Sequence, residues 1–303
     1  IKLKIYGSLL LDSTTNWDFG GQTIFFGTDS GNTITTLGKS IRHIMFSGDT
    51  IATWTLQDTL RCSRLIFRSG NFYSGGNTII AGIYEQEYIN HSRQYLDTSI
   101  IYCSMFRNHN NPVLFDGDSA TFIVSGDSME GGGLQFGTVI LPGVTHVTGS
   151  NTIERIVFFG NSILYGSNTI GDFFAGEPGI IVTLGSGTTQ TITDSVNFNG
   201  ACVGMSALVC NSLNGTATID YQCPTPFLDY VFLENVNAIG NSPTANNSVI
   251  MNSTGWNATN VAIQRNLFWV AGNGAWSDTS HWSLSSGGIG GECSPTPIDN
   301  VMF

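Results

Sequence analysis

Short apolar runs alternate with turn-forming residues along nearly the whole chain, and one short step recurs. Thr-Ile follows a small or polar residue at residues 23–24, 33–34, 50–51, 78–79, 152–153, 169–170, 191–192 and 218–219. Four of these steps read Gly/Ser-Asn-Thr-Ile. In this pattern we expect the Asn to take a left-handed or turn conformation that β-branched residues avoid, with Thr facing solvent and Ile facing the interior.

The spacing of the steps is short and irregular. Asn151 and Asn168 are 17 residues apart, and the Thr-Ile step at 191–192 begins 22 residues after the one at 169–170. Between the steps lie runs such as Ile44-Met45-Phe46, which are too short to be stable without a neighbour stacked on them. Repeats of this length predict an all-β solenoid, a right-handed parallel β-helix with inward ladders of Ile, Val, Leu and Phe. Repeats of a β-sandwich are the alternative, because evenly spaced strands also suit that fold.

The composition favours short strands and tight turns over helices. Only 11% of the residues are charged and 37 of the 303 are Gly, while few segments carry helix-forming residues at helical spacing. The net charge is −11, and the absence of a Lys/Arg cluster that could neutralise phosphates argues against nucleic acid as a partner. The longest apolar runs are strand-sized, well short of the ~20 residues that span a bilayer, so we expect no membrane span.

The chain contains six cysteines without a Cys-x-x-Cys pair, which disfavours a zinc site. Their even number fits disulfides formed in an oxidising compartment, with roughly fifteen connectivities to choose from. Buried free thiols that act as small apolar fillers are the alternative. The candidates for disulfide bonding are Cys62, Cys103, Cys202, Cys210, Cys223 and Cys293.

The amino-acid composition of the sequence changes near Asn266. Three of the six Trp lie between residues 269 and 282, and a Gly-rich stretch and a Pro-x-Pro segment follow. We therefore expect residues 1–265 to form the β-helical part and residues 266–303 to begin another module. His281 is close in sequence to Trp276 and Trp282, so we expect it to pack among aromatic rings and not to act in catalysis.

A family resemblance rests on this last segment. Residues 269–283 read Trp-Val-x-Gly-x-Gly-x-Trp-Ser-Asp-x-x-His-Trp-Ser, and residues 295–303 read Pro-x-x-x-Asp-Asn-Val-x-Phe. The pattern resembles the repeat opening of giant cell-surface adhesins of Bacteroidetes, the SprB-type gliding adhesins exported by type IX secretion. Residues 5–21 resemble the middle of that repeat and residues 230–256 resemble its end. Residues 1–265 would then be the middle and end of one repeat, and residues 266–303 the start of the next.

The resemblance implies a secreted, extracellular filament of many repeats, exported across the outer membrane and displayed on the bacterial cell surface. Its implied partners are extracellular surfaces or polysaccharides, adjacent repeats of the same chain, and the secretion and gliding machinery. In gliding species it implies a part in gliding motility. The resemblance therefore favours a structural and adhesive protein over an enzyme.

Asp stands directly before Ser or Thr unusually often, at nine of the fifteen Asp residues. These pairs resemble the O-glycosylation signal of Bacteroidetes, whose acceptor is the hydroxyl group of the second residue. Such pairs also form Asx-turns at the corners of coils, and the two interpretations are compatible because a surface turn can carry a glycan. The candidate acceptors are Ser13, Thr50, Thr59, Thr98, Ser119, Ser128, Ser195 and Thr279.

A β-helical polysaccharide lyase or hydrolase is the first alternative function. A lyase needs carboxylates beside a basic residue, and a hydrolase needs two carboxylates about 5 to 10 Å apart. The basic group Arg61, Arg64 and Arg68 has only Asp58 near it in sequence. Acidic side chains stacked on successive coils of one face, beside a groove, would support this alternative.

A carbohydrate-binding module is the second alternative, with aromatic faces stacked on sugar rings. Tyr84, Tyr88 and Tyr95 are its candidates, although inward Phe ladders explain most of the aromatic content. We expect no cofactor. Calcium is the one ion that the composition leaves open, bound by oxygens around Asp116-Gly117-Asp118, where the sequence contains no complete loop of ligands.

Overall fold

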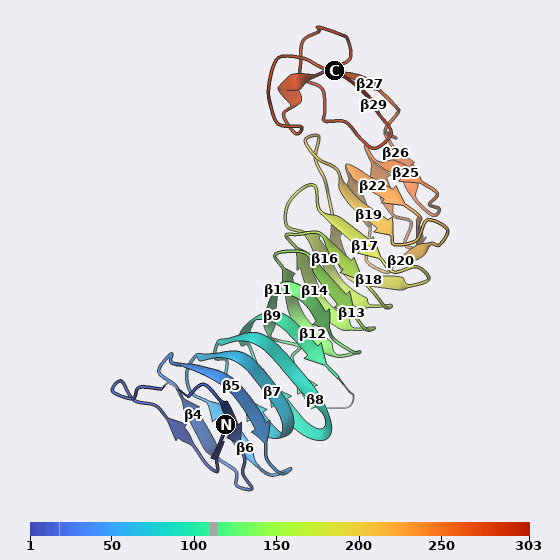
Figure 1. Ribbon diagram of the computed structural model, residues 1–303. Coiled ribbons are helices and arrows are strands. Elements are labelled where there is room, and N and C mark those ends of the chain that lie inside the picture. Colours follow the sequence, from blue (N-terminus) through green and yellow to red (C-terminus); the bar gives the residue numbers. More distant parts are fainter. Residues whose placement is uncertain (18, 110–113) are drawn as a thin grey trace. The chain divides into compact units, whose positions relative to one another are not determined.

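The computed structural model describes residues 1–17, 19–109 and 114–303, and it leaves the side chains of residues 88–91 undescribed. The chain is all-β, with 54% strand and 1% helix, and its parallel coils stack as a β-solenoid of about 11 turns (Figure 1). The predicted parallel β-helix is therefore confirmed, and the β-sandwich alternative is not. Among the described residues, no helix is long and apolar enough to cross a bilayer.

The chain divides into two compact units: unit 1, residues 1–156 with 165–169, and unit 2, residues 157–164 with 170–303. Unit 1 contains β1 (Lys2–Ile5), β2 (Leu9–Leu10), β3 (Gln22–Phe25), β4 (Asn32–Thr35), β5 (Ser40–Ser47), β6 (Thr53–Leu56), β7 (Leu60–Tyr73), β8 (Ile79–Tyr95), β9 (Ile100–Asn108), β10 (Leu114–Asp116), β11 (Thr121–Glu130), β12 (Gln135–Leu141) and β13 (Thr145–Thr148). The division falls within β14 (Thr152–Phe158) and β16 (Thr169–Ala175).

Unit 2 contains shorter strands and one turn of 3-10 helix. Its elements are β15 (Ser162–Leu164), β17 (Ile181–Leu184), β18 (Thr189–Asn197), β19 (Ser206–Cys210), β20 (Ala217–Tyr221), β21 (Phe227–Asp229), β22 (Val231–Glu234), β23 (Val236–Gly240), β24 (Thr244–Asn246), β25 (Val249–Met251), β26 (Asn257–Thr259), β27 (Asn266–Trp269), η1 (Thr279–His281), β28 (Trp282–Ser283) and β29 (Asn300–Met302).

Successive coils of unit 1 pair in parallel, so equivalent residues align in columns. Along one face β1 pairs with β3, β3 with β5, β5 with β7, β7 with β8 and β8 with β9. Because side chains alternate across a strand, each column faces either the interior or solvent. One inward column contains residues that are all 0% exposed, namely Thr23, Ile44, Leu65, Tyr84 and Phe106.

A second inward column stacks aromatic rings. The rings of Phe25 and Phe46 have centroids 5.1 Å apart, and those of Phe46 and Phe67 have centroids 5.3 Å apart, with near-parallel planes. Parallel strands lie ~4.8 Å apart, so the register itself places these rings at stacking distance. Trp54, from the neighbouring face, packs against the middle ring at 5.4 Å. The core of unit 1 is thus a set of ladders that extend from coil to coil.

The Asn of the Asn-Thr-Ile step does not take the left-handed conformation that we expected from the sequence. The glycines just before it do, with φ between 72° and 94° at Gly31, Gly76, Gly149 and Gly166. Asn151 and Asn168 are instead buried, and Oδ1 of Asn168 accepts hydrogen bonds from the backbone N–H (2.9 Å) and the Nδ2 group (3.2 Å) of Asn151. Asn151 and Asn168 thus link neighbouring coils by hydrogen bonds. The preceding glycines adopt the left-handed backbone conformation of the turn.

The expected orientation of Thr outward and Ile inward holds at the four Asn-Thr-Ile steps, where each Ile is at most 1% exposed. It is wrong at two other steps. Thr23 lies on the inward column opposite Ile44, so Ile24 faces outward. Ile51 lies in a turn and is 63% exposed. At Thr23 the register with the neighbouring coil sets the orientation, whereas Ile51 lies outside the paired strands.

Unit 2 continues the parallel stacking and ends in two small sheets. One face runs β17, β19, β22 and β25, and another runs β18, β20 and β23. β21, β24 and β26 form a three-stranded parallel sheet. The last sheet differs, because β27 pairs antiparallel with β28 and parallel with β29. The boundary that the sequence suggests near Asn266 stays a prediction.

Replacing Ile44 by Ala should destabilise the chain by about 2–5 kcal/mol, because it opens a cavity in an inward column. Ile51→Ala, at an exposed position of the same unit, should change the free energy of unfolding by less than about 0.5 kcal/mol. Equilibrium urea unfolding followed by circular dichroism measures both. Equal effects of the two substitutions would contradict the column assignment.

Candidate functional site

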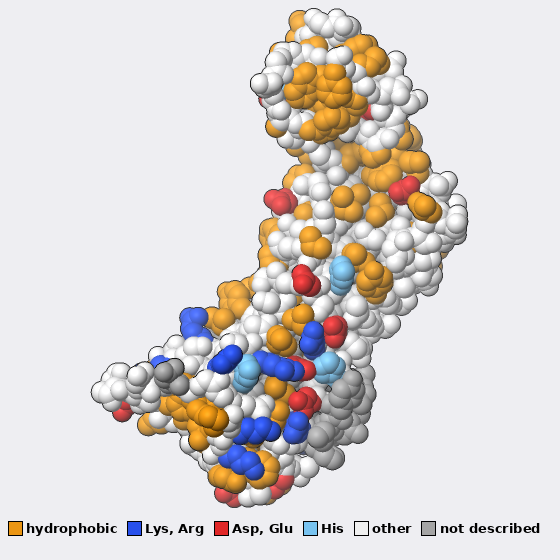
Figure 2. All heavy atoms as spheres, in the orientation of Figure 1, with side chains coloured by type: hydrophobic (Ala, Val, Ile, Leu, Met, Phe, Trp, Pro, Cys, Tyr) orange, Lys and Arg blue, Asp and Glu red, His pale blue; other side chains and the backbone are white. Residues whose placement is uncertain are grey.

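The outward face of β1, β3, β5, β7, β8, β9 and β11 in unit 1 is the candidate site. Its central column changes from apolar to charged along the coils. The column reads Lys4, Ile24, Met45, Ile66, Glu85, Arg107 and Glu130. The apolar members Ile24, Met45 and Ile66 are buried, at most 7% exposed. Basic, acidic and apolar side chains lie close together on the N-terminal part of the face drawn in Figure 2. We call this surface the ladder face.

Glu85 is the most constrained charge on the ladder face, with a side chain only 5% exposed. One of its carboxylate oxygens accepts a hydrogen bond from Nε of Arg64 at 2.6 Å, and the other lies 2.8 Å from Nε2 of His109. Arg64 stands one coil before Glu85, 21 residues earlier in the sequence. Both oxygens are therefore engaged, so burial of this carboxylate is compensated.

The basic group Arg61, Arg64 and Arg68 has only Asp58 near it in sequence. In the fold, Arg64 and Arg68 pair with glutamates of the next coil. Arg68 donates to Glu87 at 2.7 Å, parallel to the bond between Arg64 and Glu85. One coil further, Arg107 lies 3.9 Å from Glu130. Two of these pairs, Arg64–Glu85 and Arg68–Glu87, join β7 to β8, and the third, Arg107–Glu130, joins β9 to β11.

A groove of about 370 Å³ opens at the N-terminal end of the ladder face. Its lining combines cations, apolar side chains and one aromatic ring, contributed by Lys2, Lys4, Ile24, Phe26, Met45, Ser47 and Arg68. Nζ of Lys4 lies 4.9 Å from the centre of the Phe26 ring, and Phe26 is 40% exposed. Lys2 and Lys4 make no ion pair within the described part of the chain. We call this feature the basic groove.

The two described tyrosines proposed for sugar stacking, Tyr84 and Tyr95, do not form an exposed patch. Tyr84 is 0% exposed, and its hydroxyl group donates to Oε1 of Gln94 at 2.6 Å. Its ring stacks on Phe106, and burial raises its pKa well above the ordinary value. The expectation that Tyr84 binds sugar is therefore wrong, because the register makes it an inward residue. Tyr95 is half-buried and stacks on Tyr73 at 4.5 Å. The side chain of Tyr88 lies outside the described residues.

The acidic pair Asp116 and Asp118 lies near Asp97. Burial and the neighbouring carboxylates of Asp118 and Asp97 raise the pKa of Asp116. Across residues 1–17, 19–109 and 114–303, no three His, Cys, Asp or Glu side chains are grouped so as to hold a metal ion. Calcium binding at this turn therefore stays a prediction.

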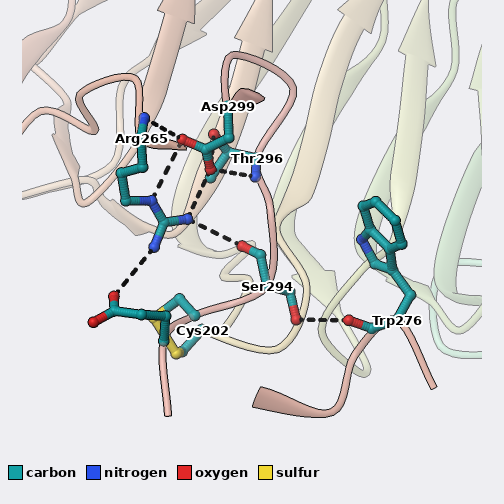
Figure 3. The surroundings of a disulfide bond; sticks show 8 residues. Cys202, Arg265, Trp276, Ser294, Thr296 and Asp299 are labelled. Atoms are coloured by element: carbon teal, nitrogen blue, oxygen red, sulfur yellow. Dashed lines mark hydrogen bonds and ion pairs between the residues drawn. A yellow bond between two sulfur atoms is a disulfide. The ribbon is translucent and has the colours of Figure 1, made fainter. Parts of the chain in front are cut away.

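Of the six cysteines, Cys202 and Cys293 form a disulfide, with their Cα atoms 4.8 Å apart (Figure 3). The thiols of Cys62, Cys103, Cys210 and Cys223 are free. Cys62 and Cys103 share an inward column but are separated by Ala81 of the coil between them. Two strand spacings of ~4.8 Å exceed the reach of a disulfide. Burial raises the pKa of both thiols to about 12, so they act as apolar fillers.

His281 packs among aromatic rings, as we expected from the sequence. Its ring stacks on Trp269 with centroids 4.6 Å apart, and its Nδ1 lies 2.9 Å from the backbone oxygen of Val270. Trp282 is 0% exposed and contacts both Trp269 and Trp276 edge-on. This aromatic cluster is the core of the last sheet.

The candidate glycosylation acceptors divide by exposure. Four are exposed, namely Ser13, Thr50, Thr98 and Ser119, and four are half-buried, namely Thr59, Ser128, Ser195 and Thr279. The Asx-turn interpretation holds at Asp12, Asp49 and Asp278, whose carboxylates accept backbone N–H groups two residues ahead. At Asp12 hydrogen bonds from Thr14 and Thr15 lower the pKa to about 2. Ser195 instead lies within a strand and donates to Asp172.

No known protein family, curated protein or solved structure matches this chain.

Glu85→Gln should destabilise unit 1 by about 1–3 kcal/mol, because it leaves Arg64 and His109 without their buried carboxylate partner. Glu130→Gln removes a partly exposed carboxylate 3.9 Å from its Arg and should cost less than about 1 kcal/mol. Urea unfolding at neutral pH measures both. If Glu130→Gln cost as much as Glu85→Gln, burial would not be the source of the effect.

Protein isolated from its native source should be heavier than the 32.5 kDa chain by a whole number of glycan units. Thr50→Ala removes an exposed candidate acceptor and should lower the intact mass by one unit. Thr33→Ala, at an exposed Thr that does not follow Asp, should lower it only by the mass of the substitution. Intact-mass spectrometry decides, and a native mass equal to that of the bare chain would exclude glycosylation.

Proposed function

We propose that this chain is a structural and adhesive segment of a secreted bacterial cell-surface protein, and that the basic groove binds acidic polysaccharide. The observation that carries the proposal is the groove itself. Lys2 and Lys4, whose ammonium groups have no ion-pair partner among the described residues, stand beside the half-exposed ring of Phe26. A uronate or sulfated sugar presents both an anion and an apolar ring face, which this lining complements.

The distribution of charge supports an anionic ligand at this place. Ten of the eleven Lys and Arg residues belong to unit 1 and only Arg265 to unit 2, whereas nine of the twenty-two acidic residues belong to unit 2. The net charges are then 10 − 13 = −3 and 1 − 9 = −8. An acidic polymer is repelled by most of the molecule, so the basic groove is where it meets the least repulsion.

The structural part of the proposal rests on the coils. Each coil supplies backbone partners and inward ladder residues to the next, so the fold extends by repetition without a new core. The disulfide between Cys202 and Cys293 supports an oxidising, extracellular location. The resemblance of residues 269–303 to SprB-type adhesins supports surface display, type IX secretion and, in gliding species, motility.

A polysaccharide lyase is the second candidate, because one observation favours it. Glu85, Arg107 and Glu130 stack on successive coils of the ladder face, and Arg64 and His109 contact Glu85. In the adhesive proposal these pairs hold the face rigid, since each Glu is matched by an Arg. In a lyase one of them would have to act as a base on the bound polymer.

Binding to alginate oligosaccharides, which are polyuronates, tests the proposal. The double variant Lys2→Gln/Lys4→Gln should weaken binding about thirtyfold, since each cation contributes roughly 1 kcal/mol at a partly exposed site and about 1.4 kcal/mol is a factor of ten. Lys39→Gln removes a cation outside the groove and should have little effect. Isothermal titration calorimetry at two salt concentrations should show weaker binding at high salt.

Neutral dextran of the same length is the ligand control and should not bind. Equal binding by the wild-type chain and the double variant would refute the groove as the site. Alginate that is cleaved to unsaturated products, seen as a rise in ultraviolet absorbance, would favour the lyase.

A further inference from the structure

The basic groove of unit 1 extends across several coils. Besides Phe26, its lining comes from four successive strands of the ladder face, namely Lys2 and Lys4 of β1, Ile24 of β3, Met45 and Ser47 of β5, and Arg68 of β7. Each of these strands pairs in parallel with the next. Parallel strands lie ~4.8 Å apart, so the three spacings from β1 to β7 separate the two ends of the groove by roughly 14 Å. The groove therefore runs along the direction in which the coils stack.

Cations stand at both ends of the groove, and the floor between them is apolar. The two lysines of β1 lie at one end, and Arg68, whose side chain is 38% exposed, lies at the other. Ile24 and Met45 are 7% and 5% exposed, and Phe26 is 40% exposed. A ligand that lies lengthwise in the groove thus meets a cation, an apolar surface and then a second cation.

The strands that form the groove carry only positive charge. β1, β3, β5 and β7 contain no Asp or Glu, and their six Lys and Arg residues are Lys2, Lys4, Arg42, Arg61, Arg64 and Arg68. The next strand along the ladder face, β8, contains Glu85 and Glu87. An anionic polymer is therefore attracted over four coils, and the attraction ends where these carboxylates begin.

Glu87 holds the cation at the β7 end in place. Its Oε2 accepts a hydrogen bond from Nε of Arg68 at 2.7 Å and lies 2.6 Å from Nη2. The third guanidinium nitrogen, Nη1, has no acidic partner among the described residues, so its N–H donors remain for a ligand. Arg is suited to this position because its planar guanidinium presents two donor edges, one for Glu87 and one for a bound carboxylate.

Resting on the function proposed above, we propose that the basic groove binds a linear polyuronate lengthwise, with about four consecutive sugars between the lysines of β1 and Arg68. An extended polyuronate advances by about one strand spacing per sugar, so one sugar lies over each of the four coils. Carboxylates of the first and last of these sugars reach the cations at the two ends, and ring faces between them rest on Phe26 and the apolar floor. The coil repeat thus selects an unbranched chain with one carboxylate on each sugar.

Binding as a function of ligand length tests this geometry. Alginate oligosaccharides of two, four and six sugars are titrated into the full chain by isothermal titration calorimetry. The tetrasaccharide should bind about tenfold more tightly than the disaccharide, because it reaches both the lysines and Arg68. The hexasaccharide should bind only about two- to threefold more tightly than the tetrasaccharide, since its additional sugars meet no further cation without an acidic partner.

A charge-balanced double variant tests the part played by Arg68. Arg68→Gln/Glu87→Gln removes the cation together with its partner, so neither charge is left unpaired. The tetrasaccharide should then bind at most about twofold more tightly than the disaccharide. Glu154→Gln/Arg155→Gln removes the same two charges from exposed positions of β14 outside the groove, and should keep the difference of about tenfold. Circular dichroism and thermal melts confirm that both variants are folded.

The length series separates lengthwise binding from the function on which it rests. A disaccharide and a tetrasaccharide that bind the wild-type chain equally well would overturn lengthwise binding and leave a short site at Lys2 and Lys4. A tetrasaccharide that binds Arg68→Gln/Glu87→Gln as tightly as the wild type would overturn it as well. Absence of binding at every length would refute the proposed function and lengthwise binding with it.

Discussion

The parallel pairing of each coil with the next is the constraint on which the rest of this molecule depends. Strands of four or five residues have too little surface to fold alone, so their stability comes from the coil above and the coil below. Parallel register then places equivalent positions of successive coils next to one another, and in several columns these positions hold similar residues. Phe25 stacks on Phe46 and Phe46 on Phe67, and buried Asn168 bonds Asn151 one coil away. Aromatic and polar side chains can therefore lie in the interior, because the next coil supplies a matching ring or hydrogen-bonding group at the equivalent position.

The same constraint produces the outward chemistry. Arg64 and Glu85, like Arg68 and Glu87, are about one coil apart in the sequence and meet only because the coils stack. The basic groove arises likewise, since Lys2 and Lys4 of the first coil stand next to Ile24 and Phe26 of the second. The residues of such a surface are far apart in the sequence. They come together only because successive coils stack.

The repeated Thr-Ile steps, the short apolar runs and the low charge sufficed to predict a parallel solenoid. The roles of individual residues were harder to predict from the sequence, because they depend on the register between coils. Tyr84 looks like an exposed aromatic residue until β7 and β9 place it in an inward column. Arg64 seems to lack an acid until the next coil supplies Glu85. A search of the sequence for Arg and Glu residues about 20 positions apart would have found the ion pairs of the ladder face. The disulfide joins cysteines 91 residues apart, a separation that the length of one coil does not predict.

Asn151 and Asn168 are 17 residues apart, whereas Gln22 and His43, which also occupy equivalent positions, are 21 apart. Coil length therefore varies while the columns stay aligned, because additional residues enter at the corners, outside the ladders. An insertion at a corner alters the display of side chains to the surroundings and leaves the interior unchanged. Such a fold can vary the side chains that it presents on its surface at little cost to its folding.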